Sequence, residues 1–446
     1  MSDPAPGRPL LRIPRVSKLA RDTVVVPGSK SVTNRALLIA ALASGDSTIE
    51  GGLSSEDTEV MIRALAAFGA GCSHGRGNVL RVEGTGGRLQ APGQSISVRA
   101  SGTALRFLTA VATLAQGSVT VTGDKRLRER PMADLIIALR RLGVDVEALG
   151  ERGRPPIRVA GSGFPGGRTR LSGRVSSQFV SALLMVGPFG RADLRLTLRQ
   201  DPVSAPYIAL TIDLMNAFGA DARSVGSRAF AVRAGSLYRG RHLRVEGDAS
   251  SASYYFALAA MLGGSITVAN VDRSSRQGDI VFLDLLRRMG AEVSPAPLGT
   301  RVTATRLSGI EADMVDAPDL VPSLAVTALC AEGRTVIKNV ASLRHKESDR
   351  LRALATELTR AGARVEELPD GLCIEPGPAR EAVIETYDDH RIAMSFGILG
   401  LVRGQIAIAD PAVVRKSYPG FWGDLALVTG RDELSAGRVA PEAWSR

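Results

Sequence analysis

Cysteine, histidine and long apolar runs are all scarce in this chain of 446 residues. Only three cysteines are present, an odd number without a C-x-x-C pair, which argues against a disulfide framework and a zinc cluster. The four histidines are scattered, so no H-x-x-x-H pair places two metal ligands on one helix face. No apolar run approaches the roughly 20 residues that a membrane helix needs. We therefore expect neither a resident metal ion nor a membrane span.

A secretory signal is also missing. The amino-terminal stretch MSDPAPGRPLLRIPRVSKLARD has no sustained apolar segment followed by a small-residue cleavage site, so we expect a cytoplasmic protein. Hydrophobic residues make up 44% and charged residues 23%, which is the mix of a folded globular protein. At roughly 150 residues per domain, the length indicates two or three domains.

The charge is unbalanced toward cations. Lys and Arg total 56 against 45 Asp and Glu, and the net charge of +11 favours anionic partners. Aromatic residues are only 4% and no block of consecutive basic residues occurs, so the stacking platforms and basic arms of nucleic-acid binders are missing. We expect small phosphorylated substrates and no nucleic acid. A non-catalytic polyanion binder is the alternative that the charge alone leaves open.

An apolar helical segment that ends at glycine and runs into a β-rich stretch recurs six times along the chain. Its glycines, spaced 69 to 74 residues apart, are Gly45, Gly117, Gly190, Gly264, Gly333 and Gly404. A second helical pattern, typified by LRRLGV, interleaves with the first at Gly69, Gly143, Gly219, Gly290 and Gly362. Two markers with one period predict six similar units, each with two helices and three or four strands.

A longer correspondence groups these units into halves. The stretch VVPGSKSVTNRALLIAALASG resembles RVEGDASSASYYFALAAMLGG at an offset of 219 residues, or three units. We therefore expect a first lobe at 27–246 and a second lobe formed by 1–26 plus 247–446. The β-rich stretch LLRIPRV precedes Pro27, and we expect it to pair back into the second lobe, so that the chain crosses between the lobes twice.

Cations gather where the first helix of a unit begins. Four backbone N–H groups lack partners at a helix start, and the helix dipole is positive there. Helix capping explains the Ser, Thr and Asp residues at these places. It does not explain Lys30, Arg35, Arg106 and the pair His390-Arg391, because cations oppose the dipole. An anion would offset them, so we predict a cleft between the halves that holds more than one phosphate or carboxylate.

The segment GDKRLRERPM adds further cations. An extended backbone here would direct Arg126, Arg128 and Arg130 to the same side, and the alternative is a solvated basic face. The motif GSGFPG at Gly161 matches a dinucleotide-binding pattern, but it contains Pro165 and no helical pattern follows. We therefore expect no nucleotide site there.

The segment SLRHKESDRLRALATELTRAG places proton-transfer candidates beside cations. On one helix, Lys346 and Arg350 would be i,i+4 neighbours with Glu347 beside them. The alternative is a surface helix laced with salt bridges. Farther along, Lys416 lies next to a turn marked by Pro-Gly.

Eleven motifs then occur in a characteristic order: PGSKSVTNRALL, SGTALRFL, RERPM, VSSQF, VSAPYI, EGDASSAS, QGDI, APD, RHKESDRL, YDDHRIAM and KSYP. From about Pro27 to Phe421, the chain resembles the family of 5-enolpyruvylshikimate-3-phosphate synthases. The resemblance implies an α/β protein with the two-domain enolpyruvyl-transferase fold, an inside-out α/β barrel in which each domain holds three βαβαββ units. It also implies no cofactor and no metal, and we expect a monomer.

The implied reaction belongs to the shikimate pathway, which leads through chorismate to the aromatic amino acids. The enolpyruvyl group of phosphoenolpyruvate moves to the 5-hydroxyl of shikimate 3-phosphate, and phosphate is released. The reaction is an addition followed by an elimination, through a tetrahedral intermediate. Positioned acid and base groups and charge stabilisation suffice for it, and closure of the two domains would exclude water.

The resemblance also carries individual residues over. Shikimate 3-phosphate is expected to contact Lys30, Ser31, Arg35, Ser176, Ser177, Gln178, Ser204, Tyr207, Asp319, Ser342 and Lys346. Phosphoenolpyruvate is expected to contact Lys30, Gly102, Arg130, Gln178, Arg350, Arg391 and Lys416. Asp319 would accept the 5-hydroxyl proton, Glu347 would protonate the methylene carbon, and Lys30 would complete the catalytic set.

Some positions depart from the family pattern. Asn is common in the family where this chain has Ala100 and Ser342, and Phe107 replaces a frequent Pro. Gly102 leaves room beside phosphoenolpyruvate, so we expect inhibition by glyphosate, which competes with that substrate in this family. The nearest alternative is UDP-N-acetylglucosamine enolpyruvyl transferase. That family carries a cysteine in the loop GDKRLRERP and a Lys-Asn pair at Lys30-Ser31, and this chain has neither.

Overall fold

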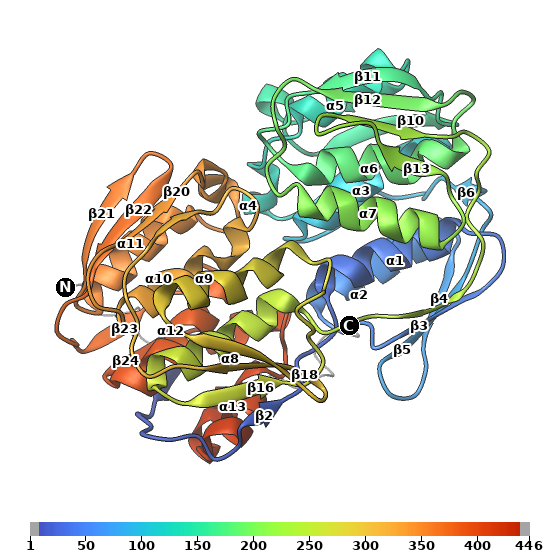
Figure 1. Cartoon of the computed structure of the whole chain (residues 1–446). Helices are drawn as coiled ribbons and strands as arrows, with labels where there is room; N and C mark the ends of the chain where they lie inside the picture. The colour runs from blue at the N-terminus through green and yellow to red at the C-terminus, as the bar shows by residue number, and fades with distance from the viewer. Residues whose placement is uncertain (1–8, 438–446) are drawn as a thin grey trace. The chain divides into compact units, whose positions relative to one another are not determined.

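The computed structural model describes residues 9–437, which form two compact units. One unit, Gly28–Val245, is unbroken in the sequence, and we call it the continuous unit. The other combines the described residues up to Pro27 with those from Glu246 onward, and we call it the split unit. In Figure 1 the continuous unit runs from blue to green, and most of the split unit runs from yellow to red.

The continuous unit has seven helices and thirteen strands among its described elements. The helices are α1 (Lys30–Leu42), α2 (Glu56–Ala67), α3 (Gly102–Val111), α4 (Lys125–Arg128), α5 (Ala133–Arg141), α6 (Ser177–Val186) and α7 (Pro206–Ala217). The strands are β3 (Ser47–Glu50), β4 (Gly71–His74), β5 (Val79–Glu83), β6 (Leu89–Gln90), β7 (Ile96–Ser97), β8 (Ala115–Thr122), β9 (Asp145–Ala148), β10 (Ile157–Ser162), β11 (Gly167–Leu171), β12 (Leu194–Leu198), β13 (Ala222–Ser224), β14 (Ala229–Val232) and β15 (His242–Arg244).

The split unit begins with two strands from the amino-terminal segment, β1 (Leu10–Ile13) and β2 (Thr23–Val24). Its helices are α8 (Ala249–Leu262), α9 (Phe282–Met289), α10 (Val321–Ala328), α11 (Arg350–Arg360), α12 (His390–Arg403) and α13 (Phe421–Thr429). Its other strands are β16 (Ser265–Val268), β17 (Glu292–Ala296), β18 (Gly299–Thr303), β19 (Glu311–Asp313), β20 (Thr335–Lys338), β21 (Arg364–Leu368), β22 (Gly371–Glu375), β23 (Ala382–Ile384) and β24 (Ile406–Ala409).

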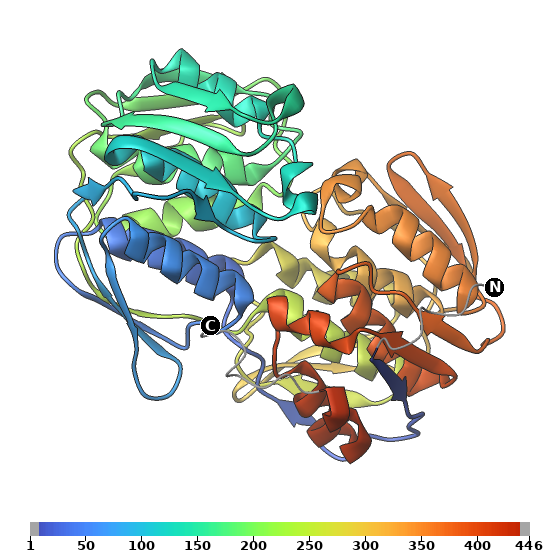
Figure 2. The ribbon, with the colours of Figure 1, turned by 180° about the vertical axis from the view of Figure 1, so that it is seen from behind.

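Each unit carries three sheets built on one plan. In the continuous unit their orders are β15-β3-β5-β4, β6-β8-β10-β9 with β7 also on β8, and β11-β12-β14-β13. In the split unit they are β2-β16-β18-β17, β19-β20-β22-β21 and β23-β24-β1. A parallel pair is followed by antiparallel strands every time. The amino-terminal strand β1 lies antiparallel to β24, as Figure 2 shows from behind, so the chain passes between the units twice.

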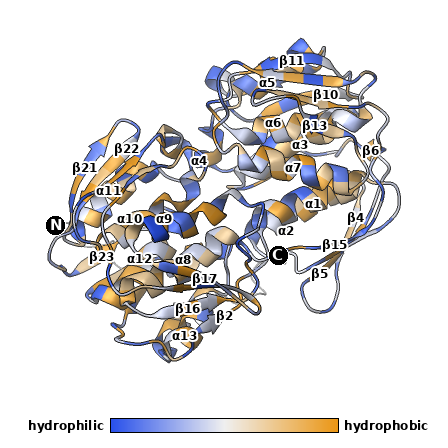
Figure 3. Cartoon of the chain, in the orientation of Figure 1, coloured by the Kyte–Doolittle hydropathy of each residue, from blue (hydrophilic) through white to orange (hydrophobic). Residues whose placement is uncertain are grey.

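The first helix of each repeat is buried on all sides because its residues are small or apolar around the whole circumference. Every residue of α1 from Val32 to Leu42 is buried, and so is every residue of α10. In the split unit α8, α10 and α12 pack against one another, and Figure 3 shows the apolar character of α1 and α10. Each unit thus has helices inside and sheets outside. The described residues include no helix with the length and apolarity to cross a membrane.

The second glycine pattern is confirmed as a helix stop. The helices α2, α5, α7, α9 and α11 end within two residues of Gly69, Gly143, Gly219, Gly290 and Gly362. These glycines have φ between 87° and 111°, the conformation in which helices commonly terminate. In the first pattern, Gly117 does not end a helix, because it lies inside β8.

Two local predictions are wrong. The segment with Arg126, Arg128 and Arg130 is not extended: α4 forms because the amide of Arg128 donates to the carbonyl of Asp124. Lys346 does not share a helix with Arg350, because α11 begins at Arg350. The carboxylate of Asp349 caps that helix by accepting from the amide of Arg352 at 3.2 Å.

Candidate active site

In the split unit, Asp319 faces three cations. It lies in the short 3-10 helix Pro318–Leu320 that leads into α10. One carboxylate oxygen, Oδ1, lies 3.2 Å from Nζ of Lys346 and 3.0 Å from Nη1 of Arg350. The other, Oδ2, accepts from Nη2 of Arg391 at 3.1 Å, at the first turn of α12. The contacts of Asp319 with Arg350 and Arg391 join residues that are 31 and 72 positions apart in the sequence.

Glu347 continues the same network. Its Oε2 accepts from Nη2 of Arg350 at 3.0 Å, and its Oε1 accepts from Nζ of Lys416 at 3.1 Å. The Lys416 side chain is only 8% exposed and the Glu347 side chain 13%, so bulk water screens this pair poorly. Six predicted site residues therefore form one continuous network: Asp319, Lys346, Glu347, Arg350, Arg391 and Lys416.

A buried carboxylate anchors Arg350. Asp389, the N-cap of α12, is fully buried, and its Oδ2 accepts from Nε of Arg350 at 2.8 Å. Burial lowers the pKa of the Arg350 guanidinium, but the carboxylates of Asp389, Asp319 and Glu347 outweigh it and hold that pKa above its ordinary value. Arg350 is therefore a permanent cation with a fixed orientation.

The same charges set the state of Asp319. Burial alone would raise the pKa of this carboxyl, but Arg391, Lys346 and Arg350 together hold it well below its ordinary value. Asp319 is consequently ionised at neutral pH and has the electron pair that a proton acceptor requires.

Another carboxylate lies behind Arg391. Nη2 of Arg391 donates to the hydroxyl of Ser250 at 3.3 Å, and that hydroxyl donates to Oδ2 of Asp279. Asp279 is 1% exposed, and burial raises its pKa to about 6 despite the proximity of Arg391. Arg391 thus lies between an ionised carboxylate at Asp319 and a carboxyl that titrates near neutral pH.

In the continuous unit, the start of α1 presents Lys30. Ser29 caps the helix by accepting from the amide of Val32, and Nζ of Lys30 lies 3.2 Å from Oδ2 of Asp57 on α2. The Lys30 side chain is 18% exposed, so its ammonium group can reach a ligand.

Arg35 is one turn farther along α1 and is 2% exposed. Its Nε donates to the hydroxyl of Thr211 at 2.7 Å, and its Nη1 donates to the carbonyl of Ser31 at 3.0 Å. The guanidinium lies over the rings of Phe107 and Tyr207, at 5.2 and 5.8 Å from their centroids. Burial lowers the pKa of Arg35 to about 10. Arg35 therefore links α1 to α3 and α7.

The starts of α3 and α6 meet through a second arginine. Nη1 of Arg106 donates to Oε1 of Gln178 at 2.5 Å, and Nε2 of Gln178 donates to the hydroxyl of Thr103 at 3.0 Å. The guanidinium of Arg130 lies against Gly102: an added Cβ there would be 2.2 Å from Nη1 of Arg130. The predicted residues Gly102, Arg130 and Gln178 are therefore together.

The other predicted residues occupy defined places. Ser176 is the N-cap of α6 and Ser177 its first residue, Ser204 has a φ of 55° ahead of α7, and Tyr207 lies in the first turn of α7. Ser342 lies in the 3-10 helix Ala341–His345, and in residues 9–437 no hydrogen bond joins its side chain to the Asp319 network.

Asp389, Ser250, Asp279 and Thr103 were not singled out as site residues in the sequence. Asp389, Ser250 and Asp279 support the cations of the split unit, and Thr103 and Arg106 fix Gln178. Arg106 was singled out in the sequence as a cation near a helix start. In the sequence, the three residues of the split unit resemble ordinary capping or loop residues. Their contacts with Arg350 and Arg391 depend on the fold.

Within the described part of the chain, no group of three or more His, Cys, Asp or Glu side chains is arranged to hold a metal ion. The carboxylates of the split unit instead contact the cations Lys346, Arg350, Arg391 and Lys416.

Comparisons with known proteins show which family this chain is similar to. The model of the EPSP synthase (3-phosphoshikimate 1-carboxyvinyltransferase) family matches residues 15–425. A 3-phosphoshikimate 1-carboxyvinyltransferase from Methanosphaerula palustris is 45% identical over 404 residues, covering 90% of this chain and 95% of that protein. One from Nostoc sp. is 41% identical over 414 residues, covering 92% and 97%.

Solved structures show the same fold. EPSP synthase from Acinetobacter baumannii superposes with a TM-score of 0.77 at 28% identity, covering 94% of this chain and 97% of that one. The enolpyruvyl transferase NikO from Streptomyces tendae has a TM-score of 0.74 at 21% identity, covering 95% and 98%, and its likeness concerns the fold alone.

Proposed function

The chain belongs to the EPSP synthase family, and we propose that the residues of two half-sites, one in each unit, carry that family's reaction in the roles given below. The half-site of the split unit comprises Asp319, Lys346, Glu347, Arg350, Arg391 and Lys416, and that of the continuous unit comprises Lys30, Arg35, Gly102, Arg130 and Gln178. The protein is a transferase of the shikimate pathway. It moves the enolpyruvyl group of phosphoenolpyruvate to the 5-hydroxyl of shikimate 3-phosphate and releases phosphate, by addition and elimination through a tetrahedral intermediate. Transfer to UDP-N-acetylglucosamine is not favoured, because the relatives carry the name of the shikimate enzyme.

Asp319 is the proposed base. It removes the proton of the 5-hydroxyl while that oxygen attacks C2 of phosphoenolpyruvate. With three cations directed at it, the carboxylate is ionised but weakly basic. The phosphate and carboxylate of the substrates compete for the same cations. When the anionic groups of phosphoenolpyruvate bind Arg350 and Arg391, and those of shikimate 3-phosphate bind Lys346, they offset the positive charge beside Asp319, and the basicity of Asp319 increases.

Glu347 is the proposed acid. It delivers a proton to C3 of phosphoenolpyruvate, which becomes the methyl group of the tetrahedral intermediate. In the second step C3 loses a proton, the C2=C3 double bond forms again, and the C2–O bond to phosphate breaks. The contacts of Glu347 with Arg350 and Lys416 hold the carboxyl in a single orientation beside the phosphoenolpyruvate cations. These cations favour the carboxylate, so Glu347 takes up the proton that it delivers to C3 once the anionic groups of phosphoenolpyruvate bind Arg350 and Lys416.

The cations divide between the two substrates. Arg130, Arg350, Arg391 and Lys416 bind the phosphate and carboxylate of phosphoenolpyruvate, with Gly102 and Gln178 beside them. Shikimate 3-phosphate contacts Ser31, Ser176, Ser177, Gln178, Ser204, Tyr207, Asp319, Ser342 and Lys346, and Arg35 supports this set. Lys30 contacts both substrates. The burial of Arg35 supports an indirect part for it, since its guanidinium is engaged with Thr211 and Ser31.

We further propose that the enzyme acts as a cytoplasmic monomer, with no nucleic-acid or membrane partner. The observation that carries the proposed function is the Asp319–Arg350–Glu347–Lys416 network, in which one arginine bridges a proton acceptor and a proton donor.

Release of inorganic phosphate tests the proposal. Phosphate should appear only when shikimate 3-phosphate and phosphoenolpyruvate are both present, and omission of either should abolish it. Replacing shikimate 3-phosphate with UDP-N-acetylglucosamine should give no release. Release with the nucleotide sugar, or none with shikimate 3-phosphate, would refute the assignment.

A further inference from the structure

The outward face of the sheet β11-β12-β14-β13 is unusually basic. Strand alternation directs Arg168 and Arg170 of β11, Arg195 of β12 and Arg223 of β13 away from the helices, and all four are exposed. None of them forms an ion pair with a carboxylate among residues 9–437. Arg168 and Arg195 are direct cross-strand neighbours, a like-charge pair that weakens a sheet.

Three other sheets of the molecule neutralise their outward cations. Arg158 of β10 pairs with Glu147 on the neighbouring strand. Arg301 of β18 lies 2.8 Å from Asp22, and Lys338 of β20 pairs with Glu311 of β19. Sheets of one architecture therefore differ in this respect, and the unneutralised arginines are not a requirement of the fold.

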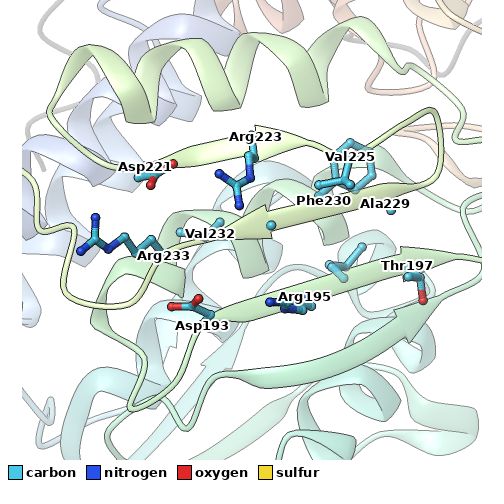
Figure 4. A pocket seen from close by; sticks show the side chains of 12 residues that line it. Asp193, Arg195, Thr197, Asp221, Arg223, Val225, Ala229, Phe230, Val232 and Arg233 are labelled. Carbon is cyan, nitrogen blue, oxygen red and sulfur yellow. The ribbon is translucent and has the colours of Figure 1, made fainter.

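Two of these arginines, Arg195 and Arg223, border a hollow. A cavity of about 320 Å³ lies on this face, and Figure 4 shows its lining side chains. Ala231 is the register partner of both Arg195 and Arg223, so the two arginines flank a small side chain in one row. With strands about 4.8 Å apart, their Cα atoms are about 10 Å apart, a span that two arginine side chains can close around one anion.

The hollow has two different ends. Val225, with 59% of its surface exposed, lies with Ala229 and Thr197 at one end of the row of arginines. Asp193, Asp221 and Arg233 lie at the other end. The volume is at the small end of the range for ligand pockets. A ligand that fits this surface is small, carries two negative charges near its middle and has an apolar group at one side.

We propose that this face binds a small organic phosphate, with the phosphate held between Arg195 and Arg223 above Ala231 and the apolar group directed toward Val225. A phosphate monoester is a dianion whose oxygens match two guanidinium forks, whereas a single carboxylate neutralises only one arginine. None of these residues belongs to the proposed catalytic or substrate-binding set, so the site is independent of the proposed function.

Calorimetric titration with phenyl phosphate tests the site in enzyme saturated with shikimate 3-phosphate. Inorganic phosphate should bind at least fivefold more weakly, and phenol should not bind detectably. The double substitution Arg195→Ala with Arg223→Ala should weaken phenyl phosphate binding at least tenfold. The matched control Arg158→Ala, which removes an outward arginine from a neighbouring sheet, should leave the affinity unchanged.

Turnover of both variants should equal that of the wild type, because the substituted side chains are exposed and outside the proposed active site. If phenyl phosphate affinity is the same in the double variant, or falls equally in Arg158→Ala, the site is refuted. Binding of a single-stranded RNA without binding of phenyl phosphate would also refute it, and would assign the face to a polyanion instead.

Discussion

The two half-sites hold their cations in different ways. In the split unit, Lys346, Arg350, Arg391 and Lys416 each contact a carboxylate within 3.2 Å. In the continuous unit, Arg35 donates to hydroxyl and carbonyl groups, and Arg106 donates to the amide of Gln178. The first arrangement is an ionic network. In the second, Arg35 and Arg106 contact neutral partners and aromatic faces, and Lys30 pairs with the carboxylate of Asp57.

This difference suits the split unit to proton transfer and the continuous unit to substrate binding. A carboxylate that faces several cations can change its protonation state when a ligand takes those cations away. Cations held by neutral groups have no carboxylate partner whose protonation state could change. They provide a fixed positive field for an anion. We infer that the split unit supplies the acid and base of the reaction, whereas the continuous unit mainly orients the substrates.

The substitution Glu347→Gln should have the largest effect, because it removes the proposed acid and preserves the shape of the side chain. General acid–base groups contribute about 10²- to 10⁴-fold, and we expect a loss in kcat of about 10³-fold or more. Binding of shikimate 3-phosphate should persist in equilibrium titration. The control Glu311→Gln alters an exposed ion pair with Lys338 and should retain wild-type turnover. A kcat near that of the wild type in Glu347→Gln would end the assignment.

In the continuous unit, Lys30→Met should impair the binding of shikimate 3-phosphate as well as turnover. Removing one member of a close charge pair costs about 2–5 kcal/mol, so we expect roughly 10²- to 10³-fold losses in kcat/KM and in shikimate 3-phosphate affinity. Steady-state kinetics and calorimetry measure the two effects. Lys125→Met, at the exposed start of α4, is the matched control. Loss of turnover with unchanged affinity would place Lys30 with the proton-transfer group instead.

The sequence proposed members for each half-site, and the structure shows which of them lie together. The family motifs proposed Asp319, Glu347 and Arg350, and the cations at helix starts proposed Arg391; the structure joins these four residues in one network. The contact between Arg350 and Asp389 was not predictable, because it joins residues 39 positions apart through tertiary packing. Asp389 has the signature of a helix cap, and it is one, since its carboxylate also accepts from the amide of Arg391.

The predictions of local conformation were wrong at two places where short-range contacts determine the backbone. Alternating arginines suggested an extended strand, but the ion pair of Arg126 with Glu129 at i,i+3 favours the turn of helix that α4 forms. Likewise, the charged run before Arg350 suggested one continuous helix, whereas the cap at Asp349 sets the helix start four residues beyond Lys346. The charge pattern therefore predicted which charged groups are present, but the capping residue determines where the helix begins.

Asp279 links the ionic network to pH. Burial raises its pKa from 3.8 to about 6, so the folded state binds its proton more tightly than the unfolded chain does. Its contribution to stability is fully present below pH 3.8 and is lost as the pH rises through 6. Between pH 4 and 7, wild type should therefore lose about 2–3 kcal/mol of unfolding free energy relative to Asp279→Asn.

Urea unfolding at several pH values measures this difference. Asp284→Asn, at an exposed position on α9, is the control, and its stability should follow the wild-type pH profile. Parallel profiles for wild type and Asp279→Asn would show that the carboxyl behind Arg391 does not titrate in this range, and would weaken the contrast between the two half-sites.

The smallest effect is expected for Gly102→Ala in the continuous unit, because this substitution adds only a methyl group that displaces a neighbouring side chain. A methyl group there would lie 2.2 Å from Nη1 of Arg130 and 3.6 Å from Nη1 of Arg106, so the end of the Arg130 side chain must move. Because no proton-transfer group is touched, Gly102→Ala should raise the KM for phosphoenolpyruvate about tenfold, roughly 1.4 kcal/mol, with little change in kcat. Glyphosate should inhibit the wild type in competition with phosphoenolpyruvate and inhibit this variant less strongly. Gly93→Ala, where an added Cβ meets no atom within 4 Å, is the control. A fall in kcat at constant KM would mean that the orienting half-site also takes part in the chemical step.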